Sequence, residues 1–190
     1  MAVVLHDGHV VLRQAPRLSS EPAVGENDSH RFLHLRSKIE SSTIRKDIKG
    51  KVDLKETPIL EWTWKVTVLP TGADCRKKTT DDQAAQLYIV WPRFPEAVRS
   101  QIIGYIWDTT APAGSIVKSQ KTGTVTYIVV RSGSADLGKW LTERRNVVED
   151  YRKIYGAAPD NPGVISIAID SDDTSSSAES FFGPILFRKP

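Results

Sequence analysis

The chain has 190 residues, of which 39% are hydrophobic and 26% are charged, and its net charge is +3 at pH 7. This length fits one domain of the larger all-β kind with a single sizeable core. Lysine and arginine are spread along the chain, which favours an ordinary solvated surface over a nucleic-acid partner. No apolar run approaches the roughly 18 residues of a membrane span. The single cysteine, Cys75, excludes an internal disulfide and a cysteine-based metal site.

The start of the chain predicts a hairpin followed by a loop. Two strand-forming arms surround Asp7-Gly8, which is a strong hairpin signal. His6 and His9 flank this turn, but two histidines without a third ligand are a weak metal signal. The first residues lack a basic start and a long apolar stretch, so no signal peptide is visible. The expected boundaries are 1–29 for the hairpin and loop and 30–190 for the main body, within a single domain overall.

The clearest strand is PILEWTWKVTVL, residues 58–69. Its apolar side chains alternate with polar ones, which is the period of a strand with one buried face. Trp62 and Trp64 share the apolar face, and each can bury roughly 150–250 Å². This stretch is therefore expected to be the central strand of the core, with both tryptophans buried.

Seven further stretches carry strand patterns, and the turns between them are short. They cover residues 30–37, 44–54, 84–91, 101–108, 124–131, 163–170 and 181–187. Gly104 lies inside one of them, which indicates a bulge or a backbone that something approaches closely. So many strands without alternating helices predict an all-β fold, a two-sheet antiparallel sandwich of the jelly-roll type.

One stretch has helical spacing, and an amphipathic helix is predicted at about 136–155. Ser134 or Asp136 can cap its start, and Gly156 is placed to end it in the left-handed conformation. Helical geometry places Arg144 in the middle of the apolar stripe. We therefore expect Arg144 to be buried and paired with a carboxylate from another element.

Aspartates gather at strand ends, where antiparallel pairing would bring them to one edge of the sandwich. Asp82 precedes one strand, whereas Asp108 and Asp170 end two others. Ser166 and Ala168 share the face of Asp170, and such small residues leave space above the sheet for a ligand. The candidate ligand-binding residues are Asp82, Gln86, Tyr88, Tyr105, Trp107, Asp108, Arg144, Asp170 and Asp172.

Three interpretations of this acidic edge stay open beside the plain one that aspartate favours turns. The carboxylates can bind Ca²⁺, hold sugar hydroxyls, or act as an acid/base pair. The metal ligands considered are Asp170, Asp172 and Asp173, and Ca²⁺ is the one cofactor considered. Their loop is not an EF-hand, because it lacks the turn glycine and Phe181 stands in place of the bidentate glutamate. No motif of a serine hydrolase, zinc protease or nucleotide-binding protein is present, and no catalytic residue is assigned.

The chain also resembles a bacterial family known as domain of unknown function, number 3047. The pieces that carry the resemblance are FLHLRS, LEWTWKV, DDQAAQLYIVW, GYIWD, WLTERRNVVEDYRKIYG, IAIDSDDT and FGPILF. Together they run in order over residues 32–187. The resemblance implies a secreted or periplasmic β-sandwich similar to jelly-roll domains that bind carbohydrate, and it implies no established activity.

The first functional hypothesis is a non-catalytic binding module for a glycan or another polar ligand of the cell envelope. The alternative is a glycan-active hydrolase or lyase that uses paired carboxylates at the same edge, and a third is a structural domain that binds a partner protein. An enzyme needs two acids roughly 5–9.5 Å apart, one with a raised pKa. A binding module needs exposed aromatic rings. The expected partner is a carbohydrate or other polar small molecule, without nucleic acid and without a membrane span.

Overall fold

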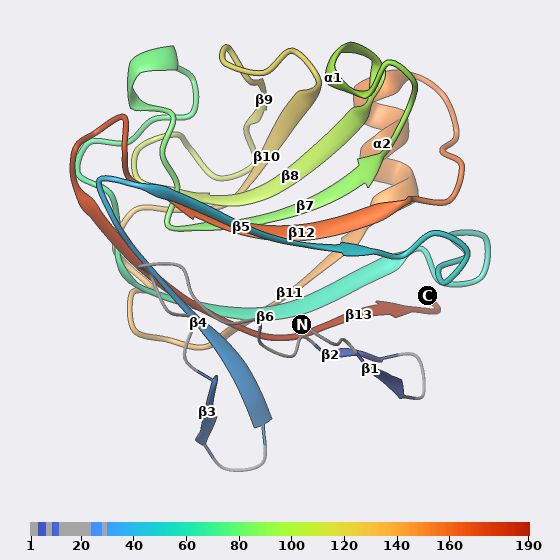
Figure 1. Ribbon diagram of the computed structural model, residues 1–190, viewed down its shortest axis with the longest axis horizontal. Helices are drawn as coiled ribbons and strands as arrows, with labels where there is room; N and C mark the ends of the chain where they lie inside the picture. Colours follow the sequence, from blue (N-terminus) through green and yellow to red (C-terminus); the bar gives the residue numbers. More distant parts are fainter. Residues whose placement is uncertain (1–3, 7–8, 12–23, 28–29) are drawn as a thin grey trace.

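The computed structural model of the chain describes residues 4–6, 9–11, 24–27 and 30–190, with side chains from Phe32 onward. Two β-sheets, one of seven strands and one of six, pack face to face (Figure 1). The predicted all-β sandwich is confirmed. The turn at Asp7-Gly8 and most of the loop expected before residue 30 lie outside the described residues, as do the side chains of His6 and His9.

The seven-stranded sheet is antiparallel throughout. Its strands are β1 (Val4–His6), β2 (His9–Val11), β3 (Val24–Asn27), β4 (His30–Lys38), β6 (Ile59–Val68), β11 (Leu141–Asn146) and β13 (Ser177–Arg188). β13 pairs with β2, β4 and β6, and β6 pairs with β11 on its other side. The expected central strand, β6, thus has a partner on both edges.

The six-stranded sheet departs from the prediction in one pairing. In spatial order its strands are β5 (Ser41–Asp47), β12 (Val164–Asp170), β7 (Ala85–Trp91), β8 (Gln101–Asp108), β10 (Val125–Ser132) and β9 (Ile116–Lys118). β8 and β10 run parallel, with Tyr127 opposite Gly104. A parallel pair needs a crossover of a dozen or more residues, and residues 109–124 supply it. The strand pair expected over residues 44–54 is the single strand β5 followed by turns.

The core between the sheets is built on aromatic side chains. Trp62 and Trp64 are both fully buried, as predicted, and their rings meet edge to face. Tyr105 packs on Trp62 and Trp107 packs on Trp64, both from the opposite sheet. The indole N–H of Trp64 donates to Oε1 of Glu143 at 3.2 Å, so its polar atom is satisfied inside the core.

The helix is shorter than predicted, because its first half is a strand. α2 covers Val147–Tyr155, and the residues before it pair with the free edge of β6. Pairing satisfies backbone groups on that edge of β6. Asn146 then caps α2 by accepting hydrogen bonds from the N–H groups of Val148 and Glu149, and Gly156 ends it with a φ of 75°, as expected.

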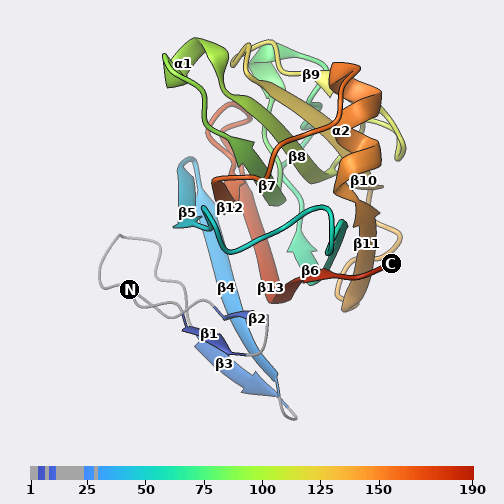
Figure 2. The ribbon, with the colours of Figure 1, turned by 90° about the vertical axis from the view of Figure 1, so that its right-hand side faces the viewer.

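α2 follows β11 directly in the chain, so this segment runs from the seven-stranded sheet to the six-stranded one (Figure 2). Tyr151 of α2 packs on Trp91 of β7 with a ring distance of 4.7 Å. Two shorter helices, η1 (Lys78–Thr80) and α1 (Glu96–Arg99), lie in loops. Among the described residues no helix is long and apolar enough to span a membrane.

The strand conformation of β11 overturns the expected burial of Arg144. Its side chain is 58% exposed, and its Nε lies 3.4 Å from Oε2 of Glu61 on β6. The partner does come from another element, but the pair lies at the surface, because alternation on β11 turns Glu143 inward and Arg144 outward. Arg131 instead makes the inward ion pair, with 2.7 Å between its Nε and Oε1 of Glu143.

Candidate functional site

The candidate site lies on the outer face of the six-stranded sheet, where β12 ends and β7 begins. In the register of this pair, Ala168 lies opposite Gln86 and Ser166 lies opposite Tyr88. These side chains point away from the core, because Leu87 and Ile167 occupy the alternate, inward positions. Figure 1 shows the loop that contains η1, together with β9, on this outer side of the sheet.

Asp170 is the central residue of the site. Its Oδ1 accepts hydrogen bonds from the backbone N–H of Gln83 at 2.6 Å and from Nε2 of Gln86 at 2.8 Å. Burial raises its pKa to about 7, and the nearby carboxylates of Asp82 and Asp81 act in the same direction. Near neutral pH this carboxyl group therefore exists both protonated and ionised.

Hydrogen bonds continue from Asp170 through further polar side chains, and we refer to Asp81, Gln83, Gln86, Tyr88, Tyr127 and Asp170 as the Asp170 network. The hydroxyl of Tyr88 donates to Oε1 of Gln86. The hydroxyl of Tyr127 lies 3.4 Å from Oδ2 of Asp81, whose Oδ1 accepts from Nε2 of Gln83 at 2.8 Å. Burial raises the pKa of both tyrosines, so their hydroxyls stay protonated at neutral pH.

Gly104 allows the two tyrosine rings to lie over the sheet. A Cβ on this residue would lie 2.7 Å from Cε1 of Tyr88 and 3.0 Å from Cδ1 of Tyr127. The close approach expected at this glycine is therefore made by the protein's own side chains. A glycine here is required by packing, since its φ is not in the left-handed region.

Three carboxylates lie close enough to share one metal ion. Asp82, Asp170 and Asp172 each offer an oxygen within 4.8 Å of the others. Asp82 is fully buried, and its Oδ2 accepts from the N–H of Thr174 at 2.7 Å. Asp173, which the sequence grouped with Asp170 and Asp172, forms an ion pair with Lys121 instead. The convergence of Asp82 with Asp170 and Asp172 follows from the antiparallel pairing of β7 and β12.

The other candidate residues lie elsewhere. Tyr105 and Trp107 point into the core, where the hydroxyl of Tyr105 donates to Oδ2 of Asp150 at 2.9 Å. Arg144 lies on the outer face of the other sheet. Of the nine candidates, the structure brings together Asp82, Gln86, Tyr88, Asp170 and Asp172.

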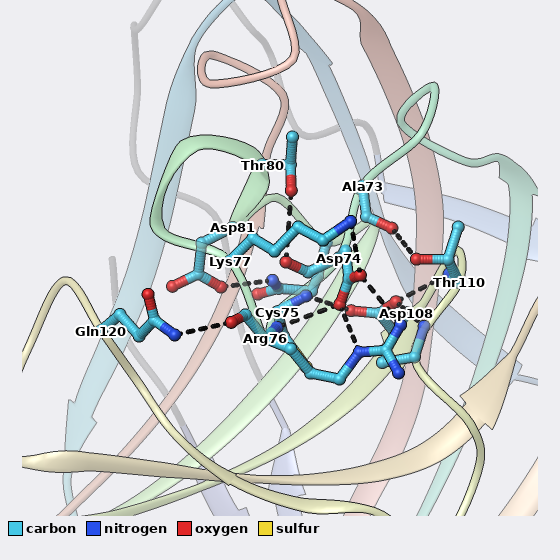
Figure 3. A network of polar contacts seen from close by, with 12 residues as sticks. Ala73, Asp74, Cys75, Arg76, Lys77, Thr80, Asp81, Asp108, Thr110 and Gln120 are labelled. Carbon is cyan, nitrogen blue, oxygen red and sulfur yellow. Dashed lines mark hydrogen bonds and ion pairs between the residues drawn. The ribbon is translucent and has the colours of Figure 1, made fainter.

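Asp108 is fully buried and anchors two loops at the same end of the sheet (Figure 3). Its Oδ2 accepts from the N–H of Cys75 at 2.9 Å. Its Oδ1 accepts from the N–H groups of Thr110 and Ala111 at 2.8 and 2.6 Å. In the loop of Cys75, Arg76 pairs with Asp74 and holds the pKa of that carboxyl well below its usual range. Asp108 thus positions the loops beside the Asp170 network.

The sequence missed Gln83 and Tyr127 as parts of the site. Tyr127 is buried and so are the residues on both sides of it on β10, so no alternation along the strand marks which face its side chain occupies. Its side chain reaches Tyr88 and Asp81 because β10 pairs in parallel with β8. No local sequence pattern predicts that β10 and β8 pair. Gln83 acts partly through its backbone N–H, which every residue except proline carries.

No curated protein matches this chain. Among solved structures, the chain is similar to the xyloglucanase domain of NopAA, a type three effector from Sinorhizobium fredii, in complex with cellobiose. The identity is 12% and the TM-score is 0.35, over 100% of this chain and 96% of that one, and a likeness this distant supports no argument about function. A family model, by contrast, matches residues 18–186, which is most of the chain. The chain therefore belongs to the family described as Protein of unknown function (DUF3047).

Proposed function

We propose that this protein binds a glycan, or another ligand rich in hydroxyl groups, on the outer face of the six-stranded sheet. The observation that carries the proposal is the Asp170 network, which presents carboxyl, amide and phenol groups from neighbouring strands on one face. Such groups both donate and accept hydrogen bonds, as sugar hydroxyls require. Ser166 and Ala168 are small, as expected, but both are buried, so the ligand would reach the network at its more exposed side chains.

Asp170 and Tyr88 are the residues through which a ligand would enter the network, because both are half-buried while Gln86 is buried. Within the described residues, both hydrogen bonds that Asp170 accepts fall on Oδ1. Its Oδ2 is therefore the oxygen that would bind a ligand hydroxyl. With a pKa of about 7, it can accept when ionised and donate when protonated.

A glycan-active enzyme is the second candidate, and one observation favours it. A carboxyl group with a pKa of about 7 is suited to general acid/base catalysis at neutral pH. Of the two carboxylates within 4.8 Å of Asp170, Asp82 is a poor nucleophile, because both of its oxygens accept hydrogen bonds from the loop at Asp173 and Thr174. We therefore place binding before catalysis.

Glycan-array binding tests the proposal. We expect Asp170→Asn and Tyr88→Phe to weaken retention of the bound glycan about tenfold, which is the effect of losing roughly one hydrogen bond to the ligand. Asp160→Asn is the matched control, because Asp160 is 81% exposed and belongs to an ion pair with Arg93 outside the network. If no glycan binds, or if both variants bind as the wild type does, the proposal is wrong. Release of new reducing ends by the wild type, lost in Asp170→Asn, would favour the enzyme.

We further propose that the shared cation of Asp82, Asp170 and Asp172 is Ca²⁺, which prefers several carboxylate oxygens. This assignment fits a location outside the cytoplasm, as the family resemblance implies. Millimolar Ca²⁺ is expected to raise the melting temperature, because a ligand bound only by the folded state stabilises it. Asp172→Asn should abolish the shift, whereas Asp173→Asn should keep it, since Asp173 pairs with Lys121. An unchanged melting temperature of the wild type would contradict the site.

A further inference from the structure

The outer face of the seven-stranded sheet carries a group of aromatic side chains. Phe32 of β4 and Phe181 of β13 meet edge to face, with ring centroids 5.7 Å apart. Trp140, just before β11, lies 5.9 Å from Phe32 and 6.3 Å from Phe181. His34 stacks parallel to Phe181 at 4.2 Å. These residues belong to three separate segments of the chain, so the group is built by the fold.

Trp140 is the exposed member of the group, with 42% of its surface accessible. The indole lies against Gly183, where a Cβ would be 3.7 Å from its Cζ3. That is an ordinary van der Waals distance, and the glycine is required instead by the hydroxyl of Thr63, which a Cβ would overlap. Trp140 thus packs against two phenylalanine rings while much of it faces water, although an exposed indole gains little from folding.

Lys65 places a cation beside this indole. Its Nζ lies 4.2 Å from the ring centroid of Phe181 and 5.2 Å from that of Trp140. In the part of the chain whose side chains are described, Lys65 has no carboxylate partner, so its ammonium is held by aromatic rings alone.

The ion pairs on the same face leave it positive. Arg36 pairs with Glu179, and Arg144 and Arg188 both pair with Glu61. One carboxylate is therefore shared by two guanidinium groups, and Lys65 adds a further positive charge. A ligand that carries negative charge is complementary to this face.

We propose that Phe32, Lys65, Trp140 and Phe181 form a second binding site, for an acidic polysaccharide whose sugar rings carry carboxylates. A pyranose ring packs its apolar C–H face on the indole of Trp140, and its carboxylate pairs with the ammonium of Lys65. Both contacts can form at once, because the ammonium of Lys65 lies 5.2 Å from the ring centroid of Trp140. Nucleic acid fits less well, since one unpaired lysine matches sparse carboxylates better than closely spaced phosphates. This site does not depend on the Asp170 network, which lies on the other sheet.

Polygalacturonate is the probe for this site, measured by affinity electrophoresis and calorimetry with the full chain. We expect Trp140→Ala and Lys65→Gln each to weaken binding at least tenfold. Lys139→Gln is the matched control, because Lys139 is also exposed and adjacent to Trp140 but pairs with Asp136. Raising NaCl should weaken binding by the wild type more than by Lys65→Gln, because salt screens an exposed ion pair.

Four results would overturn the proposal. The first is polygalacturonate binding no tighter than neutral cellohexaose. The second is unchanged affinity in both Trp140→Ala and Lys65→Gln. The third is tighter binding of oligo-dT, which would assign the face to nucleic acid. Asp170→Asn separates the two sites, because it should bind polygalacturonate as the wild type does. The fourth result is loss of binding in Asp170→Asn only, which would assign the acidic polysaccharide to the other sheet.

Discussion

Opposing effects act on the pKa of the carboxyl group of Asp170. Burial and the neighbouring acids Asp82 and Asp81 raise its pKa, whereas the two hydrogen bonds on Oδ1 lower it. Lys121, whose charge interacts with that of Asp170, is paired with Asp173. The net result, a pKa of about 7, means that the folded protein holds a proton that the unfolded chain releases near pH 4.

Asp170→Asn is therefore expected to stabilise the protein at pH 8 in the absence of divalent cations. Between pH 4 and 7 the folded state binds more protons than the unfolded state, so the stability contribution of Asp170 falls as pH rises through this window. Asparagine keeps an oxygen for Gln83 and Gln86 and carries no charge. Urea unfolding should show a gain on the order of 2–4 kcal/mol at pH 8 and little change at pH 4. Equal effects at the two pH values would contradict the raised pKa.

Trp64 and Trp140 lie at opposite extremes of exposure and allow a second test. Trp64 is fully buried, and its removal leaves a cavity and deprives Glu143 of a donor. Trp64→Ala should lower the free energy of unfolding by roughly 3–5 kcal/mol. Trp140→Ala removes the same side chain at a 42% exposed position and should cost much less. Similar losses for the two variants in urea unfolding would contradict this account of the core.

The segment 141–155 contains a strand and a helix, and only the helix could be predicted from the spacing of its apolar residues. Its apolar spacing predicts a helix, and the part over residues 147–155 is one. The first part could not be recognised as the strand β11, because its conformation is set by pairing with β6, which lies far away in sequence. Tertiary pairing overrides a local preference of this kind. The cap that marks the true start, Asn146, was present in the sequence but stood inside the apparent helix.

Asn146→Ala is expected to destabilise the protein by about 1 kcal/mol, because it removes the oxygen that accepts from the N–H groups of Val148 and Glu149. Asn146→Asp keeps an acceptor and should stay within a few tenths of a kcal/mol of the wild type. Urea unfolding measures both, and the midpoint should move without a change in slope. An equal loss in the two variants would mean that the cap is not the cause.

For the whole molecule, the sequence was informative wherever one face of a strand is polar. The alternation on β6 predicted its place and the burial of both tryptophans. The antiparallel order predicted that Asp108 joins Asp82, Asp170 and Asp172; the last three do meet, whereas Asp108 binds backbone groups of two loops. β8 was harder, because it is buried along both faces. Apolar residues then occupy both sets of alternate positions, and the pattern cannot tell that Tyr105 and Trp107 face the core. The covering loops that bury its outer face become visible only in three dimensions.

Asp108 holds those loops together through its hydrogen bonds, and the labelling rate of Cys75 can measure how often its loop opens. Asp108→Asn keeps one oxygen for Thr110 and Ala111 but places an N–H₂ group against the N–H of Cys75. The loop of Cys75 should then open more often, at a cost of about 1–3 kcal/mol for the lost buried acceptor. The thiol is fully buried, and burial raises its pKa, so a thiol reagent reaches it as a reactive thiolate only when the loop opens. We expect Cys75 in Asp108→Asn to be labelled roughly five to 150 times faster than in the wild type.

The control is Asp160→Asn, at an exposed position outside these loops, in which Cys75 should be labelled at the wild-type rate. An unchanged labelling rate in Asp108→Asn would show that the loop of Cys75 is held by other contacts.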